Sequence, residues 1–343
     1  MTDPVIAPDS AASAPTLEMV AAVAGVSRST VSRVINDSPQ VTPEALAAVR
    51  AAIDELGYVP NRAARSLASR RTQAIALIIP ENTAKFFADP YFAAVIQGVA
   101  LHMSTTDYIL TLLIAAENDR EKTRRYLRAG TVDGALILSH HSDDRSFAEL
   151  AQSLPIVFGG RPMDREQSTA SYVDVDNVEG AREVTRQLVT RGRRRIATIA
   201  GPQDMAAGLD RLVGWRLAVR EAGLHDDLVE VGDFSPESGS AAMTRLLDRG
   251  EAIDGIFVAS AQMASGALAV LHARGLSVPH DIGLVTFDND YFAQTARPAL
   301  TTIEQPTVEV GQRMAAELLR LIEGEQVERV TMMPIRLIDR ASA

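Results

Sequence analysis

Hydroxyl and basic side chains share one face of a helix that we expect over residues 27–36. They are Ser27, Arg28, Ser29, Thr30, Ser32 and Arg33. This face lies opposite an apolar stripe of Val31, Val34 and Ile35, at the spacing of a helix packed on one side. An arginine on such a face can donate two hydrogen bonds to guanine in the major groove of DNA, and a hydroxyl group can bind phosphate. These residues therefore predict contact with double-stranded DNA.

The elements around this face support the same interpretation. A helix-turn-helix needs a small residue where its helices cross, a glycine in the turn and a β-branched residue in the crossing, and Ala21, Gly25 and Val31 occupy these places. Thr16 is a good N-cap for the first helix, and a third helix is expected over residues 43–56. The alternative is a small three-helix bundle with no DNA function.

The following segment adds a family resemblance. The stretches TLEMVAAVAGVSRSTVSRVIND, YVPN and AARSLASR closely resemble the lactose-repressor family of bacterial transcription regulators, and the resemblance covers residues 16–340. It implies a homodimer that represses transcription at pseudo-palindromic operator DNA. It also implies further DNA contacts by Thr16, Asn36, Tyr58, Asn61, Ala64 and Leu67. Leu67 would be a wedge in the minor groove, whereas the alternative for its segment is an ordinary flexible linker.

Alternating strand and helix patterns fill the rest of the chain. This order is typical of α/β folds with parallel, doubly wound sheets, and two such series indicate two lobes, which the resemblance equates with the type I fold of periplasmic binding proteins. The expected parts are a disordered lead (1–15), an all-α helix-turn-helix head (16–59), a hinge helix or linker (60–72) and a two-lobed body (73–343). We expect the first lobe in about 73–160 and 305–330, and the second in about 161–304 and 331–340, with a strand near 172–175 in the second series.

A ligand site is expected between the lobes, because open α/β sheets bind ligands beyond the carboxyl ends of their strands. The candidate effector-binding residues are Asp89, Tyr91, Phe92, Ser139, Arg161, Arg211, Phe234, Ser260 and Asp288. The resemblance implies that Arg211 donates to effector hydroxyl groups, that Phe234 stacks on a sugar ring and that Asp288 accepts hydrogen bonds. Phe92 could equally anchor the next helix, and Trp215 is expected in the core.

Two departures from the family pattern concern this site. Gly160 stands before Arg161 where the family has an acidic residue, and Ser260-Ala261 replace an Asn-Asp pair that often binds sugar hydroxyl groups. A carbohydrate is the expected class of effector, and the sequence leaves its identity open.

The charge distribution agrees with a DNA-binding head on an acidic body. The chain carries a net charge of −10, whereas residues 1–71 contain seven basic and seven acidic side chains. An acidic body repels DNA everywhere except at the head. The absence of cysteine, of a secretory leader and of a long apolar run is typical of a cytoplasmic protein without a membrane partner.

Other functional classes find less support. The sequence contains no Walker loop, zinc-helix motif or nucleophile elbow, so we expect neither an enzyme nor a cofactor. His140 and His141 are adjacent and no carboxylate cluster accompanies them, which argues against a metal site. The remaining alternative is a sugar-binding protein without a transcriptional role, which would share the two lobes but would need an export signal and no DNA head.

Overall fold

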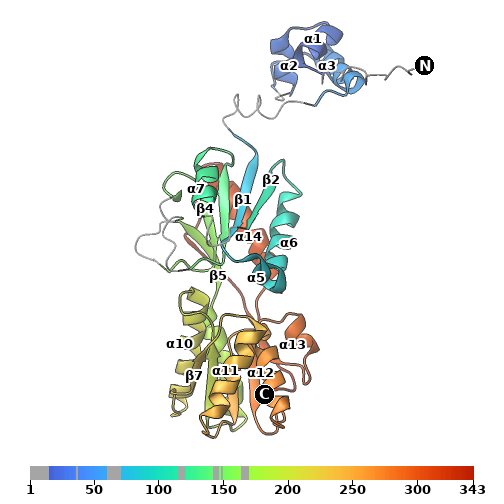
Figure 1. Ribbon diagram of the computed structural model, residues 1–343. Helices are drawn as coiled ribbons and strands as arrows, with labels where there is room; N and C mark the ends of the chain where they lie inside the picture. The colour runs from blue at the N-terminus through green and yellow to red at the C-terminus, as the bar shows by residue number, and fades with distance from the viewer. Residues whose placement is uncertain are drawn as a thin grey trace, which may run out of the picture. The chain divides into compact units, whose positions relative to one another are not determined.

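The computed structural model describes residues 15–35, 38–59, 71–114, 120–141, 147, 150–163 and 170–343. The chain forms two compact units, and the boundary between them along the chain falls between Thr72 and Gln73 (Figure 1). Several predicted features lie outside the described residues: nearly all of the lead, Asn36, and the hinge positions Asn61, Ala64 and Leu67.

The first unit is a head of three short helices. They are α1 (Leu17–Ala24), α2 (Arg28–Ile35) and α3 (Pro43–Leu56). The hydroxyl groups of Thr16, Ser27 and Thr42 each accept a hydrogen bond from a backbone N–H in the first turn of the helix that follows. Gly25 ends α1 with a φ of 65°, a left-handed conformation that glycine adopts without strain. The head therefore has the caps and the turn that its sequence predicts.

The core of the head contains one fully buried valine from each helix: Val20, Val31 and Val49. Ala21, which is 7% exposed, lies in the same cluster as Val31, and its small side chain lets α1 and α2 approach closely. This packing leaves the polar face of α2 outside the core.

The second unit is the body, and its first lobe contains a six-stranded parallel sheet. In spatial order its strands are β11 (Val330–Met333), β5 (Ser171–Val175), β4 (Ile156–Gly159), β3 (Gly134–Leu138), β1 (Ala74–Ile79) and β2 (Ile109–Ile114). Alternate residues of β1 pack on opposite faces. Ile75 and Leu77 belong to one hydrophobic cluster with residues of α6 (Pro90–Met103) and α14 (Thr307–Ile322). Ile78 belongs to another, with Leu127 of α7 (Arg120–Arg128).

The second lobe repeats this architecture. In spatial order its strands are β12 (Arg336–Ile338), β10 (Thr301–Glu304), β9 (Gly283–Phe287), β8 (Gly255–Val258), β6 (Ile196–Ala200) and β7 (Val229–Val231). Its helices are α9 (Asn177–Thr190), α10 (Ala206–Glu221), α11 (Pro236–Asp248), α12 (Ala261–Ala273) and α13 (Tyr291–Thr295). All strands are parallel except β12, which runs antiparallel to β10. Trp215 is fully buried on α10, as its expected core role requires.

The predicted fold class is confirmed, but two strands lie elsewhere than expected. The segment near residues 172–175 belongs to the first lobe, because β5 pairs with β4 and β11. A buried strand has the same sequence pattern in either sheet, so the pattern of this segment could not show which lobe it belongs to. The chain therefore enters the second lobe after Val175 instead of near residue 161.

The C-terminal segment, which was expected to belong wholly to the second lobe, is divided between the two lobes. The sequence pattern predicts one strand over residues 332–338, but Pro334 separates β11 of the first sheet from β12 of the second. Proline has no N–H to donate to a strand ladder, so pairing stops there and the chain changes lobes. With the crossing near Gln305, between β10 and α14, three connections join the lobes.

Helices α6 and α14 cross closely because each carries a glycine at the contact. A Cβ added to Gly98 would overlap the carbonyl oxygen of Val308, and one added to Gly311 would overlap that of Val95. The glycines thus bring α14, late in the chain, against an early helix of the first lobe.

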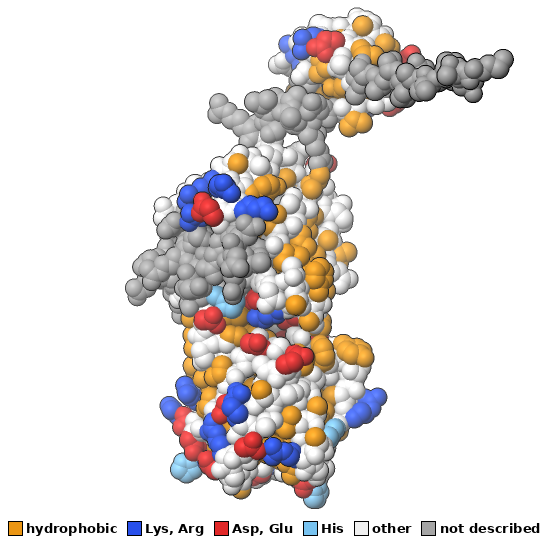
Figure 2. All heavy atoms as spheres, in the orientation of Figure 1, with side chains coloured by type: hydrophobic (Ala, Val, Ile, Leu, Met, Phe, Trp, Pro, Cys, Tyr) orange, Lys and Arg blue, Asp and Glu red, His pale blue; other side chains and the backbone are white. Residues whose placement is uncertain are grey.

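Charged side chains of both signs are interspersed over the visible face of the second lobe (Figure 2). Many are paired at the surface, such as Arg195 with Asp227 at 2.6 Å and Arg182 with Glu221 at 2.6 Å. Among the residues described, no helix has both the length and the apolar character to cross a lipid bilayer.

Candidate functional site

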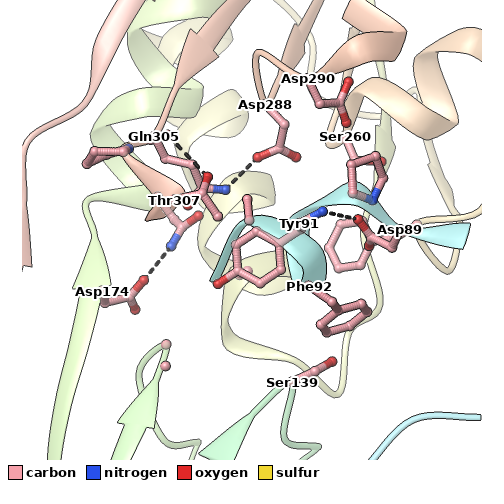
Figure 3. A pocket seen from close by; sticks show the side chains of 18 of the residues that line it. Asp89, Tyr91, Phe92, Ser139, Asp174, Ser260, Asp288, Asp290, Gln305 and Thr307 are labelled. Atoms are coloured by element: carbon pink, nitrogen blue, oxygen red, sulfur yellow. Dashed lines mark hydrogen bonds between the residues drawn. The ribbon is translucent and has the colours of Figure 1, made fainter. Parts of the chain in front are cut away.

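A pocket of about 900 Å³ lies between the two lobes of the body (Figure 3). Segments that follow β1, β3 and β4 line it from the first lobe, and segments that follow β6, β8 and β9 line it from the second. All nine predicted effector-binding residues are among its lining residues. The pocket is therefore at the carboxyl ends of the strands, where this class of sheet binds ligands.

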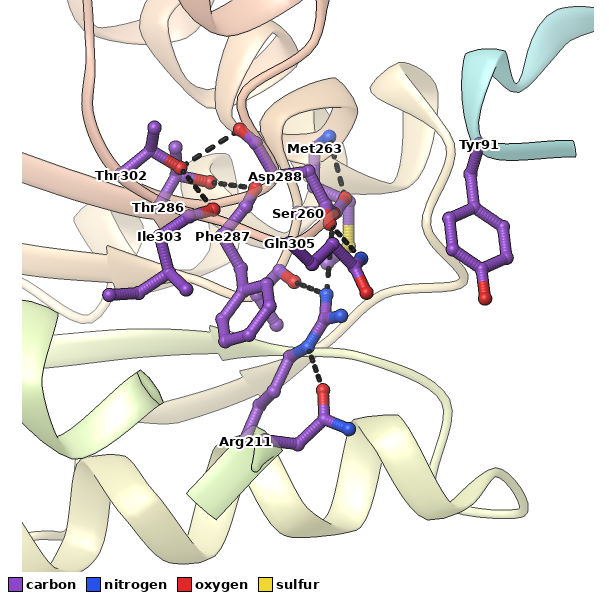
Figure 4. Close-up of polar contacts among 12 residues, drawn as sticks. Tyr91, Arg211, Ser260, Met263, Thr286, Phe287, Asp288, Thr302, Ile303 and Gln305 are labelled. Carbon is purple, nitrogen blue, oxygen red and sulfur yellow. Dashed lines mark hydrogen bonds and ion pairs between the residues drawn. The ribbon is translucent and has the colours of Figure 1, made fainter. Parts of the chain in front are cut away.

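Arg211, on α10, is the buried cation of the pocket and is held in a fixed orientation (Figure 4). Its Nε donates to Oδ1 of Asn177 at 2.9 Å, and its Nη1 donates to the carbonyl oxygen of Ala259 at 2.7 Å. Nη1 also lies 3.3 Å from Oδ2 of Asp288, and the Cζ atom of the guanidinium group is 3.7 Å from the ring centroid of Phe287. Among the described residues Nη2 has no hydrogen-bond partner, so it can donate to a ligand.

Asp288 follows β9 with a φ of 76°, in the left-handed region. Its Oδ1 accepts a hydrogen bond from Nε2 of Gln305 at 2.5 Å, and its own N–H donates to Ile303 at 2.9 Å. Ser139 and Phe234 line the same pocket and also have positive φ values, of 60° and 73°. Such conformations cost energy in residues other than glycine and concentrate at functional sites.

Asp89, Tyr91 and Phe92 form the first-lobe wall of the pocket. Oδ1 of Asp89 accepts from the backbone N–H of Tyr91 at 2.9 Å and so caps α6, and burial raises the pKa of the Asp89 carboxyl to about 6. Burial also raises the pKa of the Tyr91 phenol, which therefore stays protonated and able to donate. Phe92 is 3% exposed and packs against Phe86, so it anchors α6 as well as closing the pocket.

Three further predicted residues line the pocket but use their polar groups within the protein. Arg161 forms an ion pair with Asp210, with Nη2 at 2.7 Å from Oδ1. The Ser139 hydroxyl donates to Oε1 of Glu81 at 2.6 Å, and the Ser260 hydroxyl caps α12. These contacts within the protein hold the walls of the pocket in place.

Sequence reasoning missed several polar residues of the pocket. They are Asp174, Asn177, Gln262, Asp290 and Gln305. Asp290 belongs to the same FDND segment as Asp288, so the strand-end rule could have found it. Asp174 and Asn177 lie at the end of β5, and the misallocation of that strand to the second lobe hid them. Gln262 lies two positions after Ser260 and Gln305 directly follows β10, so the strand-end rule could have found these two as well.

In the head, the polar face of α2 remains largely accessible. Ser27, Arg28, Ser29 and Arg33 are exposed, as is Thr16, whereas Thr30 and Ser32 are half-buried. Arg28 lies 2.9 Å from Glu18 between exposed side chains, and a pair of this kind is weak enough to exchange for a nucleic acid contact. Tyr58 is only 8% exposed and packs in the core of the head, which favours a packing role over DNA contact.

Two family models match the chain. Residues 16–61 match the bacterial regulatory proteins of the lacI family, and residues 185–343 match the periplasmic binding protein-like domain. The chain is 47% identical over 328 residues to the HTH-type transcriptional regulator CelR of Thermobifida fusca, over 94% of this chain and 95% of that protein. It is 37% identical to the HTH-type transcriptional repressor PurR of Pectobacterium carotovorum, over 95% of this chain and 96% of that one.

Solved structures of other regulators are also similar to this chain over nearly its whole length. A CelR–cellobiose complex matches with a TM-score of 0.76 and 45% identity, covering 96% of this chain and 100% of that one. A lac repressor dimer bound to operator and the anti-inducer ONPF matches with a TM-score of 0.84 and 27% identity, covering 96% and 98%. With a helix-turn-helix head, a two-lobed body and relatives that match from end to end, the chain belongs to the lacI family of bacterial regulatory proteins.

Proposed function

We propose that this regulator is a dimeric repressor whose affinity for operator DNA is controlled by a β-linked glucose disaccharide, such as cellobiose, bound between its lobes. One observation carries the proposal. The pocket combines an oriented arginine, a hydrogen-bonded aspartate and aromatic rings in a chain that is 45% identical to the protein of a CelR–cellobiose complex.

The chemistry of the pocket fits a polyhydroxylated ring. Arg211 offers the donors of Nη2, and Asp288 offers acceptor lone pairs, so the two can bind neighbouring hydroxyl groups. Phe234 and Tyr91 line the pocket, and the apolar side of a sugar can stack on aromatic rings of this kind. A volume of about 900 Å³ is also sufficient for a disaccharide, since ligand pockets span roughly 300–1,000 Å³.

The head supports the DNA-binding half of the proposal. In a dimer, two heads would place the exposed faces that carry Arg28 and Arg33 on the half-sites of a pseudo-palindrome in cytoplasmic DNA. Leu67 would enter the minor groove between them, so Leu67→Ala should weaken specific binding more than non-specific binding. Equal losses on operator and random duplexes would contradict the wedge.

Fluorescence anisotropy tests the control by effector. The full-length protein first selects a pseudo-palindromic duplex from a randomised library, and its affinity for that duplex is then measured with and without cellobiose. Saturating cellobiose should change this affinity by roughly tenfold or more, and operator DNA should change cellobiose affinity by the same factor. Arg211→Ala should retain operator binding without effector and lose the response. Operator affinity that is unchanged when calorimetry shows cellobiose bound would refute the proposal.

A further inference from the structure

The charges that line the pocket are unevenly balanced. Its carboxyl groups are those of Asp89, Asp174, Asp288, Asp290, Glu304 and Glu309. Its lysine and arginine side chains are those of Lys85, Arg161, Arg211 and Arg336, and His140 also lines it. A pocket built to bind an anion needs a basic group whose charge is available to the ligand. The partners of each group therefore decide which ligands the pocket accepts.

Each lysine and arginine of the pocket already has a carboxylate partner. Nζ of Lys85 lies 3.1 Å from Glu81, and the pairs of Arg161 with Asp210 and Arg211 with Asp288 have been described. Nε of Arg336 donates to Glu304 at 3.0 Å. Two of these partners, Glu81 and Asp210, are additional to the lining, so they increase the negative balance around the ligand.

Four carboxyl groups of the pocket form no ion pair among the described residues. Glu309 is exposed, and Asp174 accepts three hydrogen bonds within the protein, which leaves Asp89 and Asp290. Asp89 accepts from the backbone N–H of Tyr91, and Asp290 accepts from the backbone N–H groups of Phe292 and Ala293 at 2.9 and 3.2 Å. Neither forms an ion pair among the described residues. Burial, followed by the nearby charge of Asp288, raises the pKa of Asp290 to about 7, and the charge of Asp288 also helps to raise that of Asp89.

These carboxyl groups do not form a metal centre. The described parts of the chain contain no group of three or more histidine, aspartate or glutamate side chains placed to hold a metal ion. Asp89 comes from the first lobe and Asp290 from the second, and the two carboxyl groups lie near enough for the charge of Asp89 to contribute to the raised pKa of Asp290. A phosphate or carboxylate on the ligand would meet both.

We infer that Asp89 and Asp290 are charge-selectivity residues, which make the pocket accept uncharged polyhydroxylated ligands and reject phosphorylated forms of the same sugar. The inference rests on the proposed function and adds the charge class of the effector to it. Above about pH 8 both carboxyl groups are ionised, and a ligand anion brought beside them without a compensating cation is repelled. At separations of a few ångströms this repulsion should weaken binding roughly 100-fold or more.

Asparagine variants test the role of charge without removing a helix cap. Both aspartates are N-caps, and asparagine is an equally good cap, so Asp89→Asn and Asp290→Asn change the charge and little else. Asp176→Asn is the matched control, because Asp176 caps α9 in the second lobe and does not line the pocket.

Calorimetry on the full chain at about pH 8.5, above the pKa of both carboxyl groups, would compare cellobiose, maltose and glucose, each with its form phosphorylated on a primary hydroxyl group. For each sugar that binds, the neutral form should bind roughly 100-fold more tightly than the phosphorylated form. Asp89→Asn or Asp290→Asn should reduce this ratio about tenfold, and Asp176→Asn should leave it unchanged.

The outcomes separate this inference from the proposed effector. A wild-type protein that binds a phosphorylated sugar as tightly as the neutral one overturns the charge selectivity, as does a ratio that neither asparagine variant alters. Binding of neutral maltose but not of cellobiose, with its phosphorylated form rejected, would refute the proposed disaccharide and support the charge selectivity. A panel in which no neutral sugar binds contradicts both.

Discussion

The guanidinium group of Arg161, at the end of β4, forms a two-point ion pair with the carboxylate of Asp210 on α10. Nη2 lies 2.7 Å from Oδ1, and Nε lies 3.2 Å from Oδ2. Because β4 belongs to the first lobe and α10 to the second, this pair joins the lobes at the wall of the pocket.

Asp210→Ala should therefore lower effector affinity without changing a pocket-lining residue. Removing one partner of a half-buried ion pair costs about 1–2 kcal/mol, which favours the open arrangement of the lobes and corresponds to roughly tenfold weaker binding. Calorimetry measures the loss, and small-angle scattering of the free body measures the opening. The control is Asp226→Ala, which removes an ion pair with Arg220 within the second lobe. Equal effects of the two variants would rule out a role for the link between lobes.

Arg211→Lys should abolish most effector binding even though the charge is kept. A lysine cannot supply the planar donors that reach Asn177, Ala259 and the ligand together. We expect effector affinity to fall at least roughly 100-fold, and the free energy of unfolding to fall by about 1–3 kcal/mol because buried acceptors lose their donor. Calorimetry and urea denaturation measure the two effects. Arg216→Lys on the exposed side of α10 is the control, and similar losses there would argue against a specific role for Arg211.

The pH dependence of stability should report on His141, whose two ring nitrogens both face carboxylates. Nε2 lies 3.2 Å from Glu81, which itself contacts Lys85, and Nδ1 lies 2.7 Å from Asp204 in the other lobe. The hydrogen bond to Glu81, followed by that to Asp204, raises the pKa of His141 to about 8, above its ordinary value of about 6.5.

A raised histidine pKa stabilises the folded state while the ring is protonated. The stability of the wild type relative to His141→Gln should thus be greatest below about pH 6.5 and should decline as the pH rises through 8. Thermal unfolding across this range tests the sign, and NMR titration of the ring tests the pKa. The matched control is His280→Gln, which makes the same substitution at an exposed histidine of the second lobe. A stability difference that grows with pH would contradict the assignment.

Gly98→Ala should destabilise the first lobe more than any exposed substitution on α6. The new methyl group would overlap the backbone carbonyl of Val308, and backbone cannot yield as a flexible side chain can. Separating α6 from α14 in a packed core should cost about 1–3 kcal/mol or more. Urea denaturation measures the change, with Ala100→Ser, exposed on the same helix, as control. A Gly98→Ala variant with the stability of the wild type would show that α6 and α14 can accommodate the added methyl group where they cross.

Sequence reasoning succeeded where the information is local. The cap at Thr16 and the turn at Gly25 depend on a few neighbouring residues, and the structure has both as expected. The pocket residues could be named for two reasons: strand ends converge in a doubly wound sheet, and the family resemblance implied the roles of Arg211, Phe234 and Asp288. Arg211 and Asp288 therefore line one pocket although 77 positions separate them.

The sequence could not reveal the relationships that depend on how the lobes meet. Arg161 was expected to bind the effector, but 49 residues separate it from Asp210, and no local pattern predicts that pair. The same limit applies to β5, whose register with β4 and β11 decides its lobe while its composition suits either sheet. Such pairings depend on tertiary packing and not on the propensity of a segment.

The division of each sheet between early and late parts of the chain has a consequence for synthesis on the ribosome. Neither sheet has its full set of strands until β11 and β12 have emerged, and Ser342, which is fully buried and bonded to Leu284, secures the second lobe later still. The head, by contrast, consists of three helices that are contiguous near the start of the chain. During translation the part that meets DNA can therefore fold well before the sensor that governs it.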